Sequence, residues 1–171
     1  SHTTLDHVLD HSAAHWGVDA GDTLIMPSPV THISGFANGL EMPLVRGTRT
    51  ILMERWDAAE AVALIDQHRV SGTVAATPFL VELADTARKA GTRLPSLRWF
   101  ACGGAAVPPE LIPSARKAFD NLVAFRVFGA SEVPLVTYGW PDNPELAATT
   151  DGEVVDYQVR IVDDEGRDLP P

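Results

Sequence analysis

The sequence predicts an α/β fold in which helices cover both faces of a parallel sheet, followed by a β-hairpin. Through the first 140 residues, short apolar segments alternate with longer segments of helical periodicity. This alternation is typical of a parallel sheet. After residue 140 the alternation stops, and a polar, proline-containing stretch leads to a short hairpin pattern. The fold class therefore follows from the alternation and from the point at which it ends.

Five helices are expected. Asp57, with Glu60 three residues later, forms a capping box, and Thr77 with Pro78 suits an N-cap and a first helical position. Because Pro113 cannot donate to the carbonyl of a residue four positions back, a kink is expected in the last helix. The predicted helices cover residues 3–16, 33–45, 57–69 and 77–90, and a fifth begins at 109.

Five strands alternate with these helices, and one hairpin follows them. In the tail, residues 157–162 alternate and residues 163–166 have the composition of a turn, which predicts the hairpin. Loops at the carboxyl ends of parallel strands form the ligand crevice of open α/β folds. The predicted strands cover residues 22–26, 50–53, 72–76, 98–101 and 122–128.

The charge distribution argues against two classes of partner. The chain carries a net charge of −10 and has no basic stripe. Residues 141–171 hold nine acidic and two basic side chains, a net −7, and the first 140 residues carry the remaining −3. An acidic surface repels the phosphate groups of nucleic acids and of anionic membranes. Neither nucleic acid nor a membrane is expected as a partner.

Cysteine content and hydropathy indicate the compartment. Cys102 is the single cysteine, which excludes an intrachain disulfide and fits a reducing environment. No apolar run approaches the roughly 20 residues needed to span a bilayer. The first residues lack a basic segment followed by an apolar core, so no signal peptide is expected here. A cytoplasmic protein is the expectation.

Two loops that follow predicted strands could carry chemistry. In FGASE, residues 128–132, the Ser131 hydroxyl can bond to a phosphate oxygen and the Glu132 carboxylate can hold Mg²⁺. An ordinary turn with a solvated glutamate fits the same spacing. In CGGAA, residues 102–106, paired glycines permit a tight turn and close ligand approach, but a simple strand-to-helix turn is the alternative. Cys102 is expected to be a small buried residue rather than a nucleophile.

Histidines occur in two patterns. His32 lies between a proline-rich turn and an apolar helix start, so it could line a pocket or be a structural residue. His7, His11 and His15 recur at every fourth position, a column that could bind a transition metal. Because this column points away from the apolar stripe of its helix, a solvated polar face is the favoured interpretation.

Taken in order, these segments resemble the adenylate-forming superfamily of acyl-CoA synthetases, which includes firefly luciferase and the adenylation domains of peptide synthetases. PSPVTHISGF is similar to the proline–histidine motif, and ATPFL and WFACGGAAVPPEL to the middle strands and glycine loop. FGASEVP corresponds to the Tyr-Gly-x-Thr-Glu signature. The similarity covers essentially the whole chain and leans towards ligases for medium-chain or alicyclic acids, such as cyclohexanecarboxylate.

The resemblance implies a domain division and a reaction. Residues 1–140 would form a flavodoxin-like, three-layer α/β subdomain, and residues 141–171 a linker and the start of a β-barrel subdomain. The enzyme would join a small carboxylic acid to ATP, giving acyl-AMP and pyrophosphate, and would then form the acyl-CoA thioester. ATP/AMP, Mg²⁺ and coenzyme A are the implied cofactors and partners, and the oligomeric state stays open.

The resemblance also implies residue roles. Glu132 would hold Mg²⁺, Ser131 would bond to the α-phosphate, and His32 would lie beside the reacting carboxylate. Phe128 would stack on adenine, with phenylalanine in place of the usual tyrosine, and Ser131 replaces the usual threonine. The residues implied to bind the nucleotide are Gly103, Gly104, Ala105, Phe128, Gly129 and Ser131. The residues implied to bind the acid are His32, Phe36 and Gly104.

Other parts of such an enzyme have no counterpart in this stretch. They are the phosphate loop with its lysine, the ribose-binding aspartate, and the mobile C-terminal domain with its catalytic lysine. The chain is therefore expected to be an internal fragment that is inactive alone. Two alternatives stay open: a non-catalytic nucleotide-binding α/β module, and an adenylating enzyme with an acceptor other than CoA.

Overall fold

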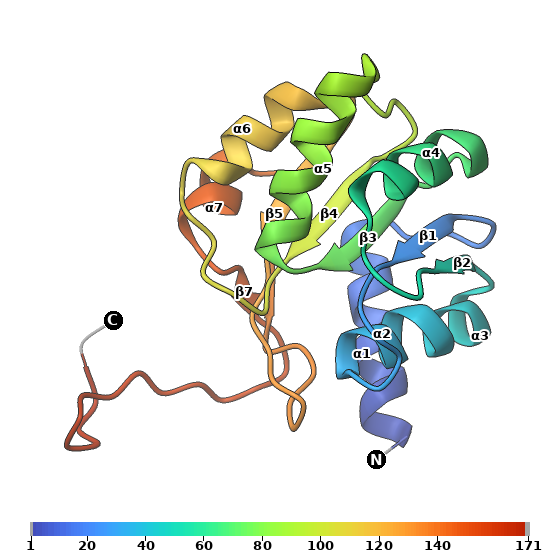
Figure 1. Cartoon of the computed structure of the whole chain (residues 1–171). Coiled ribbons are helices and arrows are strands. Elements are labelled where there is room, and N and C mark those ends of the chain that lie inside the picture. The colour runs from blue at the N-terminus through green and yellow to red at the C-terminus, as the bar shows by residue number, and fades with distance from the viewer. Residues whose placement is uncertain (1, 170–171) are drawn as a thin grey trace.

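A five-stranded parallel sheet forms the centre of the computed structural model, which describes residues 2–169 (Figure 1). The strand order is β2-β1-β3-β4-β5, and every neighbouring pair is parallel. This is the flavodoxin-like order, so the predicted fold class is confirmed. The strands are β1 (Thr23–Met26), β2 (Arg49–Leu52), β3 (Gly72–Ala75), β4 (Trp99–Cys102) and β5 (Val123–Arg126).

Helices cover both faces of this sheet. On one face α4, α5 and α6 pack side by side, with α7 beside α6 (Figure 1). On the other face α1 packs against the helical segment that follows β1, and this segment includes six π-helical residues, η1. The helices are α1 (His2–Trp16), α2 (Ile33–Gly35), η1 (Phe36–Glu41), α3 (Met42–Arg46), α4 (Ala58–His68), α5 (Thr77–Ala90), α6 (Leu111–Ala118) and α7 (Pro144–Thr149).

The core follows from the strand order. Strands β1 and β4 are buried along their whole length because both lie inside the sheet, whereas β2 is a partly exposed edge strand. Trp16 of α1 contacts Trp99 and Phe125, with ring centroids 5.5 and 5.6 Å apart, and so fixes α1 to the sheet. A Cβ at Gly72 would lie 1.9 Å from the Trp99 ring, so this packing requires glycine there.

Two predicted helix starts have different outcomes. The Asp57 carboxylate accepts hydrogen bonds from the backbone N–H groups of Ala59 and Glu60, both at 2.9 Å, which confirms the cap of α4. The assignment of Thr77 as an N-cap is wrong by one residue, because Ala76 occupies that position. The Thr77 hydroxyl instead donates to the carbonyl of Ala106 at 3.1 Å. It therefore joins the start of α5 to the glycine loop.

Proline explains one error and signals one missed helix. Helix α6 begins at Leu111, so Pro113 is its third residue, where an N–H has no partner within a helix. The reason for expecting a kink is therefore wrong.

Helix α7 lies in a stretch expected to be an irregular connection. Its signals were present, because Asn143 caps it by accepting from Leu146 N at 3.1 Å and Pro144 is its first residue.

A small antiparallel sheet joins the chain segments on either side of residue 140. Strand β6 (Thr137–Tyr138) pairs with β7 (Glu153–Val154), which forms a separate two-stranded sheet. The hairpin predicted further on is reduced to a single bridge between Val162 and Asp168, closed by a turn at residues 163–166. Within residues 2–169, no helix has the length and apolar character that a bilayer crossing requires.

Candidate functional site

A cavity of about 680 Å³ opens at the carboxyl edge of the sheet. It is lined by the segments that follow β1, β3, β4 and β5, and by one face of α1. The strand order reverses between β1 and β3, and open α/β sheets bind ligands at such a switch point. The topology alone therefore makes this cavity the candidate small-molecule site.

Predicted site residues from three distant parts of the chain meet in this cavity. Those that line it are His32, Gly103, Gly104, Gly129 and Ser131. The other predicted residues lie outside the lining and are exposed: Phe36, Ala105, Phe128 and Glu132. All four directly follow or adjoin lining segments. The structure thus brings the motifs to one edge of the sheet, and the individual roles stay predictions.

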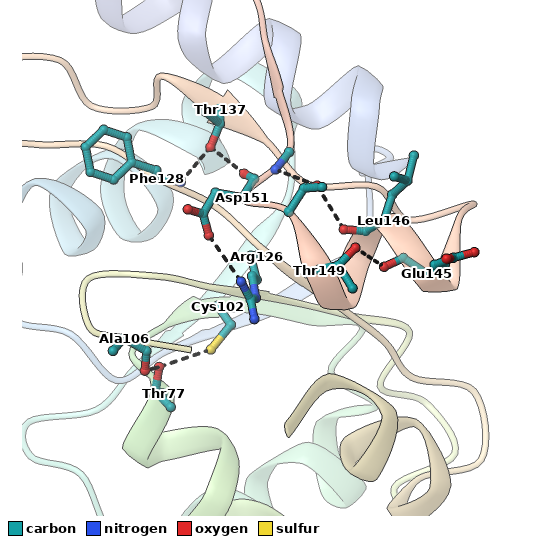
Figure 2. Close-up of polar contacts among 12 residues, drawn as sticks. Thr77, Cys102, Ala106, Arg126, Phe128, Thr137, Glu145, Leu146, Thr149 and Asp151 are labelled. Carbon is teal, nitrogen blue, oxygen red and sulfur yellow. Dashed lines mark hydrogen bonds and ion pairs between the residues drawn. The ribbon is translucent and has the colours of Figure 1, made fainter. Parts of the chain in front are cut away.

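The loop after β5 is held from both sides. The backbone N–H of Phe128 donates to the Thr137 hydroxyl at 2.9 Å, and that hydroxyl donates to the carbonyl of Asp151 (Figure 2). Ala130 and Val133 exchange two backbone hydrogen bonds, at 2.8 and 3.1 Å. These bonds close a tight turn that places the two residues at its tip, 131 and 132, beside the cavity.

Glu132 lies at this tip with its side chain directed into solvent-exposed surroundings. Its side chain is exposed, and within residues 2–169 its carboxylate has neither a hydrogen bond nor an ion pair. Gly129, at the base of the turn, has a packing role, because a Cβ there would lie 2.4 Å from the carbonyl oxygen of Pro134. The turn thus offers one hydroxyl and one unpaired carboxylate.

The two glycines of the β4 loop serve different purposes. A Cβ at Gly103 would lie 2.6 Å from the carbonyl oxygen of Val127, so Gly103 lets the loop pack against β5. Gly104 has φ +74° and nothing within 4 Å of its Cβ position. Since side chains rarely adopt that conformation, glycine keeps this wall of the cavity open. A ligand could therefore contact the backbone at Gly104.

His32 is held at the start of α2. Its Nδ1 accepts from the backbone N–H of Ser34 at 3.3 Å and lies 2.8 Å from the Ser34 hydroxyl. A nitrogen that accepts cannot carry the proton of a neutral imidazole, so Nε2 carries it. His32 therefore offers an N–H donor at the cavity. In addition, η1 begins directly after α2, and π-helical turns recur at functional sites.

Cys102 is a structural residue, as expected. It is fully buried, and its Sγ lies 3.6 Å from the Thr77 hydroxyl (Figure 2). Burial raises the pKa of the Cys102 thiol, and the Thr77 hydrogen bond and the Arg126 charge offset only part of that effect. The thiol is therefore protonated near neutral pH and is not a nucleophile.

Sequence reasoning missed part of the cavity wall. Asn38 lines it, is buried, and donates from its side-chain amide to the carbonyl of Ser34 at 3.0 Å. Phe79 lines it from the first turn of α5 and packs on Trp56, with ring centroids 4.8 Å apart. Asn38 lies one helical turn beyond Ser34, and Phe79 lies in the ATPFL segment directly after β3, which was noted without a role for this residue. Topology, rather than residue type, was the signal that could have identified them.

The cavity lining contains no lysine or arginine among the described residues. The two lysines of the chain, Lys89 and Lys117, lie in the last turns of α5 and α6, away from the carboxyl edge. Arg126 ends β5, with its Nη1 3.7 Å from Asp151 Oδ1 (Figure 2). The polar groups of this largely apolar cavity are therefore hydroxyl, amide, indole, imidazole and backbone groups.

An open 2-1-3-4-5 sheet with a cavity at its switch point, bordered by a glycine loop and a serine–glutamate turn, defines an α/β protein that binds small molecules. The chain belongs to the family of AMP-binding enzymes, whose family model matches residues 2–171. This result confirms the resemblance found in the sequence.

Individual relatives agree with this assignment. The chain is 30% identical over 152 residues to a medium-chain fatty-acid–CoA ligase of Escherichia coli K12. This alignment covers 88% of this chain and 26% of that protein. It superposes on an amide bond synthetase of Marinactinospora thermotolerans with a TM-score of 0.81 at 26% identity, covering 99% of this chain and 35% of the other.

A third match supports the fold alone. The O-succinylbenzoate–CoA synthetase of Bacillus subtilis, solved with ATP and magnesium ion, has a TM-score of 0.81 at 21% identity. It covers 98% of this chain and 34% of the synthetase. The chain thus spans between about a quarter and about a third of these three relatives.

Proposed function

We propose that this chain forms the nucleotide- and acid-binding edge of an AMP-forming acid–thiol ligase. In that reaction a carboxylate oxygen attacks the α-phosphorus of ATP, the bond to the pyrophosphate group breaks, and the CoA thiol later displaces AMP. The observation that carries the proposal is the cavity at the switch point, in which His32, Gly104 and Ser131 meet. The similarity to a medium-chain fatty-acid–CoA ligase supports an acid of that class.

The proposed roles follow from the donors that each residue offers. His32 donates from Nε2 to the substrate carboxylate and orients it, since Nδ1 is occupied by Ser34. The Ser131 hydroxyl donates to an oxygen of the α-phosphate. Phe128, with 56% of its surface exposed, provides a free ring face on which adenine can stack. Gly104 and its neighbours separate adenine from the acyl group.

The residues of the turn fit a magnesium ion. Mg²⁺ in enzymes that act on nucleotides is held by one or two carboxylates together with substrate phosphates. Glu132 has an exposed carboxylate without a protein partner among residues 2–169, and such an oxygen ligand suits this ion. When bound, Mg²⁺ would reduce the repulsion between the carboxylate and the phosphates.

We also propose that the chain by itself does not catalyse the reaction. Two anions must approach each other, and the cavity lining supplies no cationic side chain among the described residues. The similarity to an amide bond synthetase supports a second candidate, an adenylating enzyme that transfers the acyl group to an acceptor other than CoA. A cytoplasmic location stays a prediction from the single cysteine.

The test is acid-dependent ATP–pyrophosphate exchange in the complete enzyme. Glu132→Gln keeps the size of the side chain and removes its charge, so we expect exchange with a medium-chain acid to fall on the order of 100-fold or more. Glu145→Gln, which changes an exposed carboxylate in the first turn of α7, is the matched control and should keep the rate. An unchanged rate in Glu132→Gln would show that the magnesium assignment is wrong.

Two further assays separate the candidates. Consumption of CoA during turnover distinguishes the acid–thiol ligase from an enzyme that uses another acceptor. For the chain alone, we expect no acid-dependent consumption of ATP. Clear turnover by the chain that is lost in Glu132→Gln would contradict the proposal of inactivity.

A further inference from the structure

Helix α1 presents its histidine column to another part of the chain. The sequence favoured a solvated polar face for His7, His11 and His15, and this expectation is wrong for His15, whose side chain is only 18% exposed. The ring of Tyr138 lies against His11 and His15, with centroids 5.4 and 5.8 Å away. The segment that includes β6 and β7 thus covers the column, and this was invisible to helical periodicity.

His15 and the two preceding histidines have different surroundings. The Nε2 of His15 donates to the carbonyl of Gly139 at 2.7 Å, and only 18% of its side chain is exposed. That bond attaches α1 to the end of β6. His7 and His11 have no such backbone bond among the described residues, and their side chains are 57% and 39% exposed. Those two histidines are therefore accessible from solvent.

A carboxylate completes a group of three around them. The Nε2 of His7 lies 2.8 Å from Asp156 Oδ2, and the Nδ1 of His11 lies 4.0 Å from the same oxygen. One ligand atom from each residue lies within 4.8 Å of the other two. Around a tetrahedral zinc ion with bonds near 2.0–2.1 Å, ligand atoms are about 3.3 Å apart. Small side-chain rotations therefore suffice to bring all three onto one ion.

The backbone places Asp156 at this position. Asp156 has φ +60°, a conformation that aspartate adopts more readily than most residues. It lies two residues beyond β7, and β7 is fixed by its pairing with β6. The carboxylate thus approaches α1 from a segment 149 positions away in the sequence.

We propose that His7, His11 and Asp156 form a site for a divalent transition metal ion, with Zn²⁺ as its best fit, which joins α1 to the segment after β7. Two imidazoles and one carboxylate suit zinc, nickel and copper, whereas magnesium and calcium require oxygen ligands. The three side chains leave a fourth position for water. The proposal is independent of the ligase reaction, because none of the three residues lines the cavity.

The experiment is a calorimetric titration of the purified, metal-free chain with ZnCl₂. We expect one zinc ion per chain, and binding at least tenfold weaker in His7→Gln, in His11→Gln and in Asp156→Asn. Asparagine also tolerates the left-handed conformation, so Asp156→Asn tests the ligand and not the backbone. His68→Gln, which changes an exposed histidine at the end of α4, is the matched control and should bind zinc as the unsubstituted chain does.

A second readout distinguishes a metal site from a purely structural contact. Zinc should raise the melting temperature of the unsubstituted chain and of His68→Gln, because a ligand that binds only the folded state stabilises it. The increase should be absent in Asp156→Asn, whatever the melting temperature without zinc. Equal zinc affinity in all four variants, or no zinc binding by the unsubstituted chain, would overturn the proposal.

Discussion

Residues 2–140 and residues 141–169 differ in how far they bury their apolar side chains. The first region buries most of them in one cluster that extends from α1 to β6, although some, such as Leu44 and Phe128, stay exposed. The second contributes Ala147 and Ala148 of α7 to that cluster, whereas the apolar residues beyond β7 are largely exposed. Those with 42–69% of their surface exposed are Val159, Ile161, Val162 and Leu169. The first region is therefore stabilised by burial, and the end of the second by local bonds.

The largest expected difference between the regions is in the cost of truncating an apolar side chain. Phe125, on β5, is fully buried, so Phe125→Ala should lower the free energy of unfolding by about 3–5 kcal/mol. Ile161→Ala, at a side chain that is 69% exposed, should change it by less than about 0.5 kcal/mol. Urea unfolding of both variants measures this. A comparable loss in Ile161→Ala would show that the tail is packed after all.

A smaller effect is expected at Tyr138, where the regions meet. Burial, followed by the charges of Tyr157 and Asp156, raises the pKa of Tyr138 to about 12 from its usual 10. The neutral phenol is therefore favoured in the folded state. Its contribution, about 2–3 kcal/mol, is fully present below pH 10 and is lost as the pH rises from 10 to 12. Between pH 10 and 12 the free energy of unfolding of Tyr138→Phe should therefore decrease less than that of the unsubstituted chain. An identical pH dependence of the two would contradict the assignment.

The smallest effects are expected from ion pairs, and these again differ between regions. Asp22 accepts two hydrogen bonds from Arg98, at 2.8 and 2.7 Å, and its side chain is only 15% exposed. Asp22→Asn should cost about 1–2 kcal/mol. Asp168 pairs with Arg160 at 2.8 Å, but both side chains are more than 60% exposed, so Asp168→Asn should cost less than about 0.5 kcal/mol. Thermal unfolding of both variants measures the two losses of stability, and equal losses would contradict this difference between the regions.

The sequence predicted well those features that depend on neighbouring residues. All five strands of the sheet and the cap at Asp57 were predicted, because apolar runs and capping residues act locally. The one-residue error at Thr77 arose because its hydroxyl bonds to Ala106 instead of the start of its own helix. Helix α7 was missed because the polar composition of its surroundings outweighed its own capping signal.

Features that depend on distant contacts could not be predicted from periodicity. The strand order came from the family resemblance, since alternation alone does not fix which strands are neighbours. The motif segments that carry His32 and Ser131 were identified, but Asn38 and Phe79 were not, because only the folded chain shows which side chains face the cavity. Likewise, helical periodicity gave no indication that Asp156 lies beside His7.

The most direct test of the account is a crystal structure of the complete enzyme with a non-hydrolysable acyl-adenylate, such as an acyl sulfamoyl adenosine with a medium-chain acyl group. We expect adenine between the loop at residues 103–105 and Phe128, the sulfamoyl group beside Ser131, and the acyl chain beyond His32. An analogue bound elsewhere, with the cavity at the carboxyl edge of the sheet left free, would contradict the proposed site.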